Sequence, residues 1–246
     1  MDPASLSLPR ERHDGILTIT AFEGAITVRV LPDSEKAERA FMFDIVFQTR
    51  HPRLQGVPKP PEHFHPFQEE YMTVLEGTLV VEVDGVEHAL KPGDAEFAVR
   101  RGANHRLYPP RRNEGPPAAQ AAAEEDEVVR FLLSGEQTPN PFKLDLVFFE
   151  NWYAYQELLV VHQARLDVFR LLSMFDAGDS YLTLPWWVPF RSTVSQAVGV
   201  VGGRWIGGLL GYQPFYKEWT TEWDLACEKM ETSIFQRRFS DRKKAS

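Results

Sequence analysis

Three histidines and one glutamate combine residue types and spacings that could bind a metal ion. His63 and His65 are separated by one residue, so on a strand both side chains point to the same face. Glu70 follows five residues after His65, and His105 lies on a later segment, after Gly102. Three imidazoles and one carboxylate can form a nitrogen and oxygen site for a divalent metal such as iron, manganese, nickel, copper or zinc. A β-barrel could bring them together, because alternate residues of its strands point to the interior.

These residues resemble the two sequence motifs of the cupin family. The first motif is a His-x-His pair, then a glutamate, then six residues and a glycine; the second begins with a glycine and ends in Gly-x-x-His. The matching positions in this chain are His63, His65, Glu70 and Gly77, followed by Gly93, Gly102 and His105. The resemblance covers residues 20–135, and it implies a jelly-roll barrel whose metal ligands are His63, His65, Glu70 and His105.

The second motif departs from the cupin pattern in the segment around His105. One extra residue lies between Gly93 and Gly102, the usual proline is replaced by Arg100, and the closing asparagine position is Pro109. All four ligand positions are nevertheless intact.

Glu69 is the alternative to Glu70 as the acidic ligand. It fits the looser spacing of the first motif, but it leaves seven residues before Gly77, so Glu70 is the predicted ligand and Glu69 a neighbour of the site. A cupin that keeps these residues without binding metal is the alternative for the whole set. Arg100, Arg101 and Arg106 flank His105; they could clamp an anionic substrate group, but we interpret them as solvated.

The segment that holds the motifs is rich in short predicted strands. Runs of β-branched and aromatic residues alternate with turn residues, and Asp84-Gly85 is a hairpin signal. The predicted strands are 16–22, 26–31, 41–47, 71–74, 78–83, 86–90, 95–99 and 128–133. We expect an antiparallel β-barrel over residues 16–145, interrupted by a mobile loop at 111–127, which has no large apolar residue.

After Asn140-Pro141 the apolar period changes to that of helices. Helices are predicted over 152–175, 193–210 and 217–235. Residues 146–246 are therefore expected to form a helical extension rich in aromatic residues and glycine. The predicted class is α+β, a cupin (jelly-roll) β-barrel followed by a helical C-terminal extension.

A glycine stripe marks the second predicted helix. Gly199, Gly203, Gly207 and Gly211 recur every four residues, so they leave one helix face bare and open to a neighbouring backbone. Between aromatic belts such a stripe is typical of membrane helices, although Arg204 near its centre argues against a span. The helix is expected to pack on the barrel, to form a homodimer, or to contact a membrane surface through residues 186–219.

Composition excludes several functional classes. A formal net charge of -8 argues against nucleic-acid binding, and the single cysteine, Cys227, excludes a disulfide framework or a multi-cysteine metal site. The sequence has no dinucleotide-binding or P-loop glycine motif, so neither NAD nor ATP is implied. The N-terminal residues have no apolar core of the kind a secretory signal requires, so a cytoplasmic location, with or without membrane association, is expected.

These observations predict a metal-dependent enzyme with a small-molecule substrate. The resemblance extends to stand-alone cupins of fungal secondary-metabolite pathways, which implies an oxidoreductase acting on a small aromatic or polyketide-derived intermediate. Iron or manganese is favoured over copper, nickel or zinc as the single divalent ion. Two alternatives stay open: a non-redox isomerase, cyclase or dehydratase, and a cupin that binds a small molecule without turnover.

Overall fold

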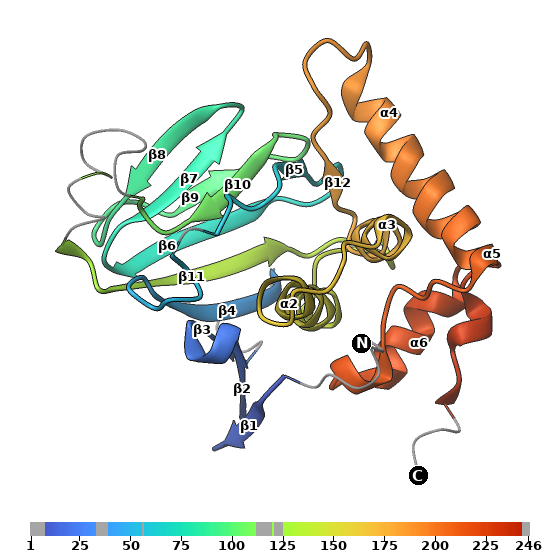
Figure 1. Cartoon of the computed structure of the whole chain (residues 1–246), viewed down its shortest axis with the longest axis horizontal. Coiled ribbons are helices and arrows are strands. Elements are labelled where there is room, and N and C mark those ends of the chain that lie inside the picture. Colours follow the sequence, from blue (N-terminus) through green and yellow to red (C-terminus); the bar gives the residue numbers. More distant parts are fainter. Residues whose placement is uncertain (1–7, 33–38, 56, 112–119, 121–124, 243–246) are drawn as a thin grey trace. The chain divides into compact units, whose positions relative to one another are not determined.

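The computed structural model describes residues 8–32, 39–55, 57–111, 120 and 125–242. They form two compact units: a strand-rich unit of Leu8–Phe64 and Gln68–Gln137, and a helical unit that holds Thr138–Ser246 together with His65–Phe67. Most of the predicted loop at 111–127 lies outside the described residues. The predicted α+β class is confirmed (Figure 1).

The larger sheet of the strand-rich unit is antiparallel and has the order β1-β2-β3-β4-β11-β6-β9. These strands are β1 (Arg10–His13), β2 (Ile16–Ala21), β3 (Ile26–Val30), β4 (Arg39–Gln48), β11 (Val128–Glu136), β6 (Glu70–Glu76) and β9 (Phe97–Val99), and a 3-10 turn, η2 (Phe22–Gly24), follows β2. Burial alternates along β6, where Glu70, Met72 and Val74 are buried. Because alternate side chains share a face, Glu70 is the acidic member of an otherwise apolar buried row.

The smaller sheet contains, in spatial order, β5 (His63–Phe64), β10 (His105–Tyr108), β7 (Leu79–Val83) and β8 (Val86–Leu90). The hairpin between β7 and β8 turns at Asp84 and Gly85, whose φ values are 48° and 81°. Two positive φ angles are what the predicted two-residue Asp-Gly turn requires. The predicted strands are confirmed, although the residue pattern does not predict β1, β5 or β10.

The helical unit is built from short helices that follow one another closely. They are α2 (Leu146–Val160), α3 (Val168–Ala177), α4 (Arg191–Val198), the π-helical η4 (Gly199–Gly207), α5 (Gly208–Leu210), the 3-10 turn η5 (Lys217–Trp219), α6 (Trp223–Glu231) and the 3-10 turn η6 (Arg237–Phe239), with a short strand β12 (Tyr181–Leu182). The predicted helix 193–210 is confirmed as the continuous run α4, η4 and α5, and Figure 1 shows it as one rod.

Two predicted helices are wrong in extent. The helix predicted over 152–175 is two helices, because Gln163 adopts a left-handed φ of 53° and the Asp167 side chain accepts a hydrogen bond from the Arg170 N–H, which starts α3. The helix predicted over 217–235 shrinks to η5 and α6. Thr220 is extended between them, and its buried hydroxyl donates to the carbonyl of Tyr216.

The glycine stripe is a packing surface within the helical unit. A Cβ atom on Gly203 would lie 2.4 Å from the carbonyl carbon and oxygen of Leu172 in α3, and one on Gly199 would lie 2.6 Å from the ring of Tyr181. Only glycine allows backbones to approach this closely. Gly211, with a φ of 106°, ends the helix in the left-handed conformation.

The helical unit has a core and buried ion pairs of its own. An apolar cluster joins α2, α3 and α6 through Phe142, Val147, Ala177, Phe215, Ala226, Cys227 and Met230. Lys229 and Asp145 form a buried ion pair of 2.6 Å, and Arg204 pairs with buried Asp176 at 2.7 Å. Among the described residues, no helix has both the length and the hydropathy needed to cross a bilayer.

Candidate metal centre

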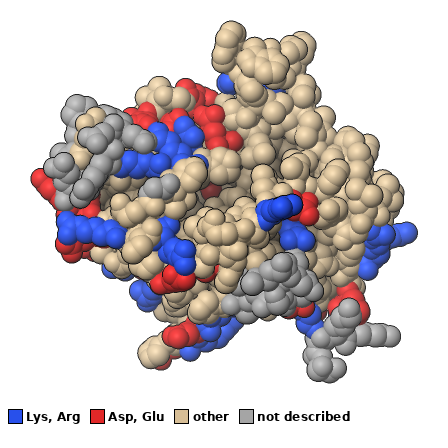
Figure 2. Space-filling model, in the orientation of Figure 1, with Lys and Arg blue, Asp and Glu red and all other residues tan. Residues whose placement is uncertain are grey.

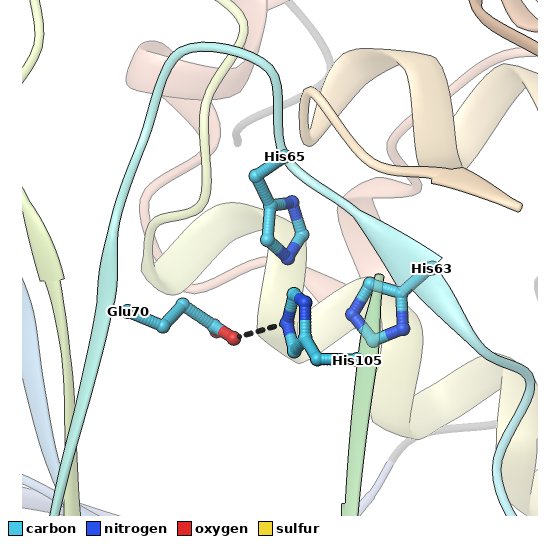
Figure 3. Close-up of side chains that lie close together, drawn as sticks. All are labelled: His63, His65, Glu70 and His105. Atoms are coloured by element: carbon cyan, nitrogen blue, oxygen red, sulfur yellow. Dashed lines mark hydrogen bonds and ion pairs between the residues drawn. The ribbon is translucent and has the colours of Figure 1, made fainter. Parts of the chain in front are cut away.

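Three of the predicted ligands lie on strands of the strand-rich unit. His63 on β5 is the register partner of His105 on β10, and their ring centroids are 4.6 Å apart. Glu70 opens β6 on the buried face, and its Oε2 lies 2.8 Å from Nε2 of His105. This contact links the two sheets. His65 lies in the turn between β5 and β6 (Figure 3).

The structure brings all four residues together. One potential ligand atom from each of His63, His65, Glu70 and His105 lies within 4.8 Å of the other three. His65, Glu70 and His105 are buried, and His63 is half-buried. Figure 3 shows the four side chains pointing toward one another. An arrangement of three imidazoles and one carboxylate in a buried setting is compatible with a divalent metal ion.

The orientation of the three imidazole rings follows one rule. In each ring Nδ1 lies within hydrogen-bond distance of a backbone carbonyl: His63 with Pro61 (3.1 Å), His65 with Asp179 (3.2 Å) and His105 with Ala103 (2.9 Å). Because a carbonyl can only accept, each Nδ1 must carry the hydrogen. In the neutral ring Nε2 then has the lone pair, which is the arrangement typical of metal-binding histidines.

In the pair of Glu70 and His105, the carboxylate of Glu70 accepts a hydrogen bond and favours the protonated, positively charged form of the His105 ring. Complete burial disfavours the charge on His105, but the hydrogen bond and the negative charge of Glu70 outweigh it, so the pKa of His105 is raised. Glu69 is placed differently: it is half-buried, and its Oε2 accepts from the hydroxyl of Tyr71 at 2.9 Å. The structure therefore brings Glu70, and not Glu69, into the cluster.

Asp179 and Ser180, which the sequence does not mark as site residues, contact Nδ1 of His65 on the side of the ring opposite Nε2. Nδ1 of His65 also lies 3.2 Å from Oγ of Ser180, and that hydroxyl donates to the carbonyl of Gly178, so its oxygen accepts from His65. The Asp179 carboxylate accepts from the N–H of Phe67 at 3.2 Å, and burial raises the pKa of Asp179 to about 7. These residues are more than one hundred positions away from His65, and nothing in their own sequence marks them.

Comparison with known proteins identifies the family. A Cupin domain model matches residues 54–132, which include the whole cluster. An oxidoreductase of Arthrobotrys oligospora is 42% identical over 239 residues, covering 96% of this chain and 89% of that protein. The chain belongs to the cupin family.

Other cupins of similar sequence carry related names. One named a probable oxidoreductase, yanE, from Aspergillus niger is 43% identical over 95% of this cupin and 88% of its own length. The epoxidase atD of Aspergillus terreus is 41% identical over 73% of this cupin and 52% of its own length. A cupin-superfamily sugar phosphate isomerase from Silicibacter pomeroyi, known by crystal structure, is 23% identical with a TM-score of 0.32, covering 47% of this cupin and 61% of that chain.

The structure explains why one position of the cupin motif is a glycine. Gly77 has a φ of 68°, and a Cβ atom there would lie 2.3 Å from the carbonyl oxygen of Val128 on β11. Both the left-handed conformation and the close approach require glycine. The motif residue thus fixes the turn that leads from β6 to β7.

The arginines beside His105 are held by carboxylates of the strand-rich unit. Arg101 pairs with Glu136, and Arg106 pairs with Glu82 through contacts of 2.9 and 2.7 Å. The hydrogen bond from Arg106 is the strongest influence on Glu82 and, with the hydroxyl of Tyr108, holds its pKa at about 2. Arg100 and Arg101 are exposed, as expected of solvated arginines, whereas Arg106 is half-buried against Glu82. The guanidinium groups of Arg101 and Arg106 each form a two-pronged ion pair.

Proposed function

We propose that this cupin is a metal-dependent oxidoreductase that acts on a small aromatic or polyketide-derived molecule. The observation that carries the proposal is the common orientation of the three histidines: their Nδ1 atoms are anchored on backbone carbonyls, and the rings meet around Glu70. Relatives named oxidoreductase and epoxidase support the redox class. The substrate class rests on the resemblance to cupins of fungal secondary metabolism.

The donor set fits a redox-active divalent metal. His63, His65, Glu70 and His105 would hold it with three neutral nitrogens and one carboxylate, and the cluster contains no thiolate of the kind structural zinc prefers. Bound there, iron or manganese would supply Lewis acidity and one-electron chemistry to a substrate or dioxygen. The protein's own part is to keep the rings in one tautomer and to place the negative charge of Glu70 beside them.

Metal analysis tests the site. Protein purified without chelators and without air should contain a stoichiometric amount of iron or manganese. His65→Ala and His105→Ala should lose the metal while retaining the circular dichroism of the folded chain. Glu70→Gln should weaken binding much more than Glu69→Gln, because only Glu70 lies in the cluster. Stoichiometric metal in His65→Ala would contradict the assignment.

The redox class needs a separate experiment. Iron-loaded protein under argon should give a new electronic absorption band with nitric oxide, a stand-in for dioxygen, and His65→Ala should not. A panel of small aromatic and polyketide-type compounds should then include one whose turnover consumes dioxygen and gives an oxidised product. Equal turnover without dioxygen and a product of unchanged mass would replace the oxidoreductase by an isomerase or cyclase. Binding without turnover would indicate a small-molecule-binding cupin.

A further inference from the structure

The helix formed by α4, η4 and α5 has two faces of opposite character. Its glycines Gly199, Gly203 and Gly207 are buried in the helical unit. Large apolar side chains occupy the other side at helical spacing, and all are exposed. We call them the outer face: Val194, Val198, Val201, Trp205, Ile206, Leu209 and Leu210. A helix whose outer side faces water normally carries polar residues at these positions.

The loop that leads into α4 extends the outer face. Trp186, Trp187 and Phe190 are 83%, 68% and 84% exposed, and the two most exposed large apolar side chains of the described residues are among them. Pro185 and Pro189 bracket the tryptophan pair and stiffen this loop. Large aromatic side chains held out in water at one end of an apolar helix mark a surface that contacts another apolar phase or partner.

The segment that carries the outer face contains charged side chains of one sign only. Residues 180–217 contain no Asp or Glu, in a chain whose net charge is -8. Arg204 turns inward to Asp176, whereas Arg191 at the start of the helix and exposed Arg237 near its end form no ion pair among the described residues. Arg237 follows Phe235, whose ring lies 5.9 Å from that of Trp205. Figure 2 shows a broad area without charged side chains over α4.

We propose that the outer face and the loop 186–190 bind the surface of an anionic lipid bilayer, with the helix lying in the plane of the interface. Apolar side chains enter the acyl boundary, tryptophans prefer the headgroup level, and unpaired arginines meet lipid phosphates. The protein lies on the membrane and does not cross it. This binding is independent of the proposed redox activity.

A second copy of the chain suits this face less well. In a two-fold dimer the same patch meets itself, so antiparallel helices would bring Arg191 of one copy toward Arg237 of the other. Residues 180–217 offer no carboxylate to compensate these like charges. An anionic lipid surface satisfies both arginines and covers both the loop and the helix.

Vesicle binding tests the proposal with the full chain. The protein should sediment with phosphatidylcholine/phosphatidylserine vesicles, and its tryptophan emission should shift to the blue. Trp186→Ser/Trp187→Ser should weaken binding by about tenfold or more, because both side chains are exposed and the loss leaves packing intact. The matched control is Val86→Ser/Leu166→Ser, which removes two exposed apolar side chains that are not part of the outer face and should bind normally.

A charge-reversal variant and a measurement of the oligomeric state complete the experiment. Arg191→Glu should reduce binding to phosphatidylserine vesicles several-fold and remove most of its salt dependence, with little effect on phosphatidylcholine alone. Absence of binding to either vesicle would overturn the proposal. So would a dimer in solution that Trp186→Ser/Trp187→Ser converts to a monomer while neither form binds vesicles, since the face would then be an interface between copies.

Discussion

Removing the hydroxyl of Ser180 should weaken metal binding although Ser180 is not a ligand. Nδ1 of His65 has two acceptors at 3.2 Å, the carbonyl of Asp179 and Oγ of Ser180. Ser180→Ala removes one of them and leaves the backbone carbonyl. Loss of an outer partner of a metal-binding histidine costs about 10- to 100-fold in affinity. Because half of the anchoring remains, we expect the lower end, about tenfold, which is ~1.4 kcal/mol.

Two measurements separate this effect from simple destabilisation. A competition titration with a chromophoric chelator gives the affinity for metal, and nitrogen-15 NMR of the metal-free protein reports the histidine tautomers. Ser180→Ala should increase the population of His65 with the hydrogen on Nε2. Thermal unfolding should show a loss of only about 1 kcal/mol for one buried hydrogen bond.

The control is Ser192→Ala, which changes an exposed serine at the start of α4. It should match the unmodified protein in metal affinity and tautomer. If Ser180→Ala binds metal as tightly as Ser192→Ala does, and the His65 tautomer is unchanged, then the Asp179 carbonyl orients the ring alone and the reasoning for Ser180 is refuted.

Two further perturbations test the packing and the charges. Gly203→Leu should lower the free energy of unfolding by about 2 kcal/mol or more, because even its Cβ would lie 2.4 Å from the Leu172 backbone. Thr193→Leu, at an exposed position, should change it by no more than about 0.5 kcal/mol. Urea unfolding measures both. Since Arg106 lowers the pKa of Glu82 from 4.5 to about 2, the stabilisation is present above pH 4.5 and is lost as the pH falls toward 2. The metal-free Glu82→Gln variant should therefore be less stable at neutral pH and should lose less stability on acidification, and an unchanged pH profile would contradict this.

The sequence identifies the four clustered residues of the candidate site, but it does not identify Asp179 and Ser180, which contact His65. The His-x-His spacing and Glu70 lie within one local segment, so the sequence identifies them as one set, although His65 lies in the turn after β5 and only Glu70 is placed by alternation along its strand. Glu70 is distinguished from Glu69 by the same alternation, which buries one and leaves the other half-buried. Asp179 and Ser180 reach His65 only through the tertiary fold, and no local pattern encodes that contact.

The helical unit shows a similar division. The glycine stripe identifies a helix face that needs a close neighbour, and the structure supplies α3. Periodicity alone cannot name that neighbour, because many surfaces could meet a bare stripe. Apolar spacing also continues across the break between α2 and α3. There the left-handed Gln163 and the capping side chain of Asp167 override the pattern.

The direct opposition of His63 and His105 has a consequence for insertions and deletions. The two histidines face each other in an antiparallel ladder in which β5 has only two residues. A slip of one residue in either strand would turn one imidazole to the opposite side of the sheet. A single added residue within β10 should therefore abolish the cluster even if it is chemically conservative. The extra residue between Gly93 and Gly102 can be absorbed in the turns on either side of β9, outside that ladder. In this cupin, an inserted or deleted residue within β5 or β10 should therefore damage the cluster more than the replacement of most side chains around it.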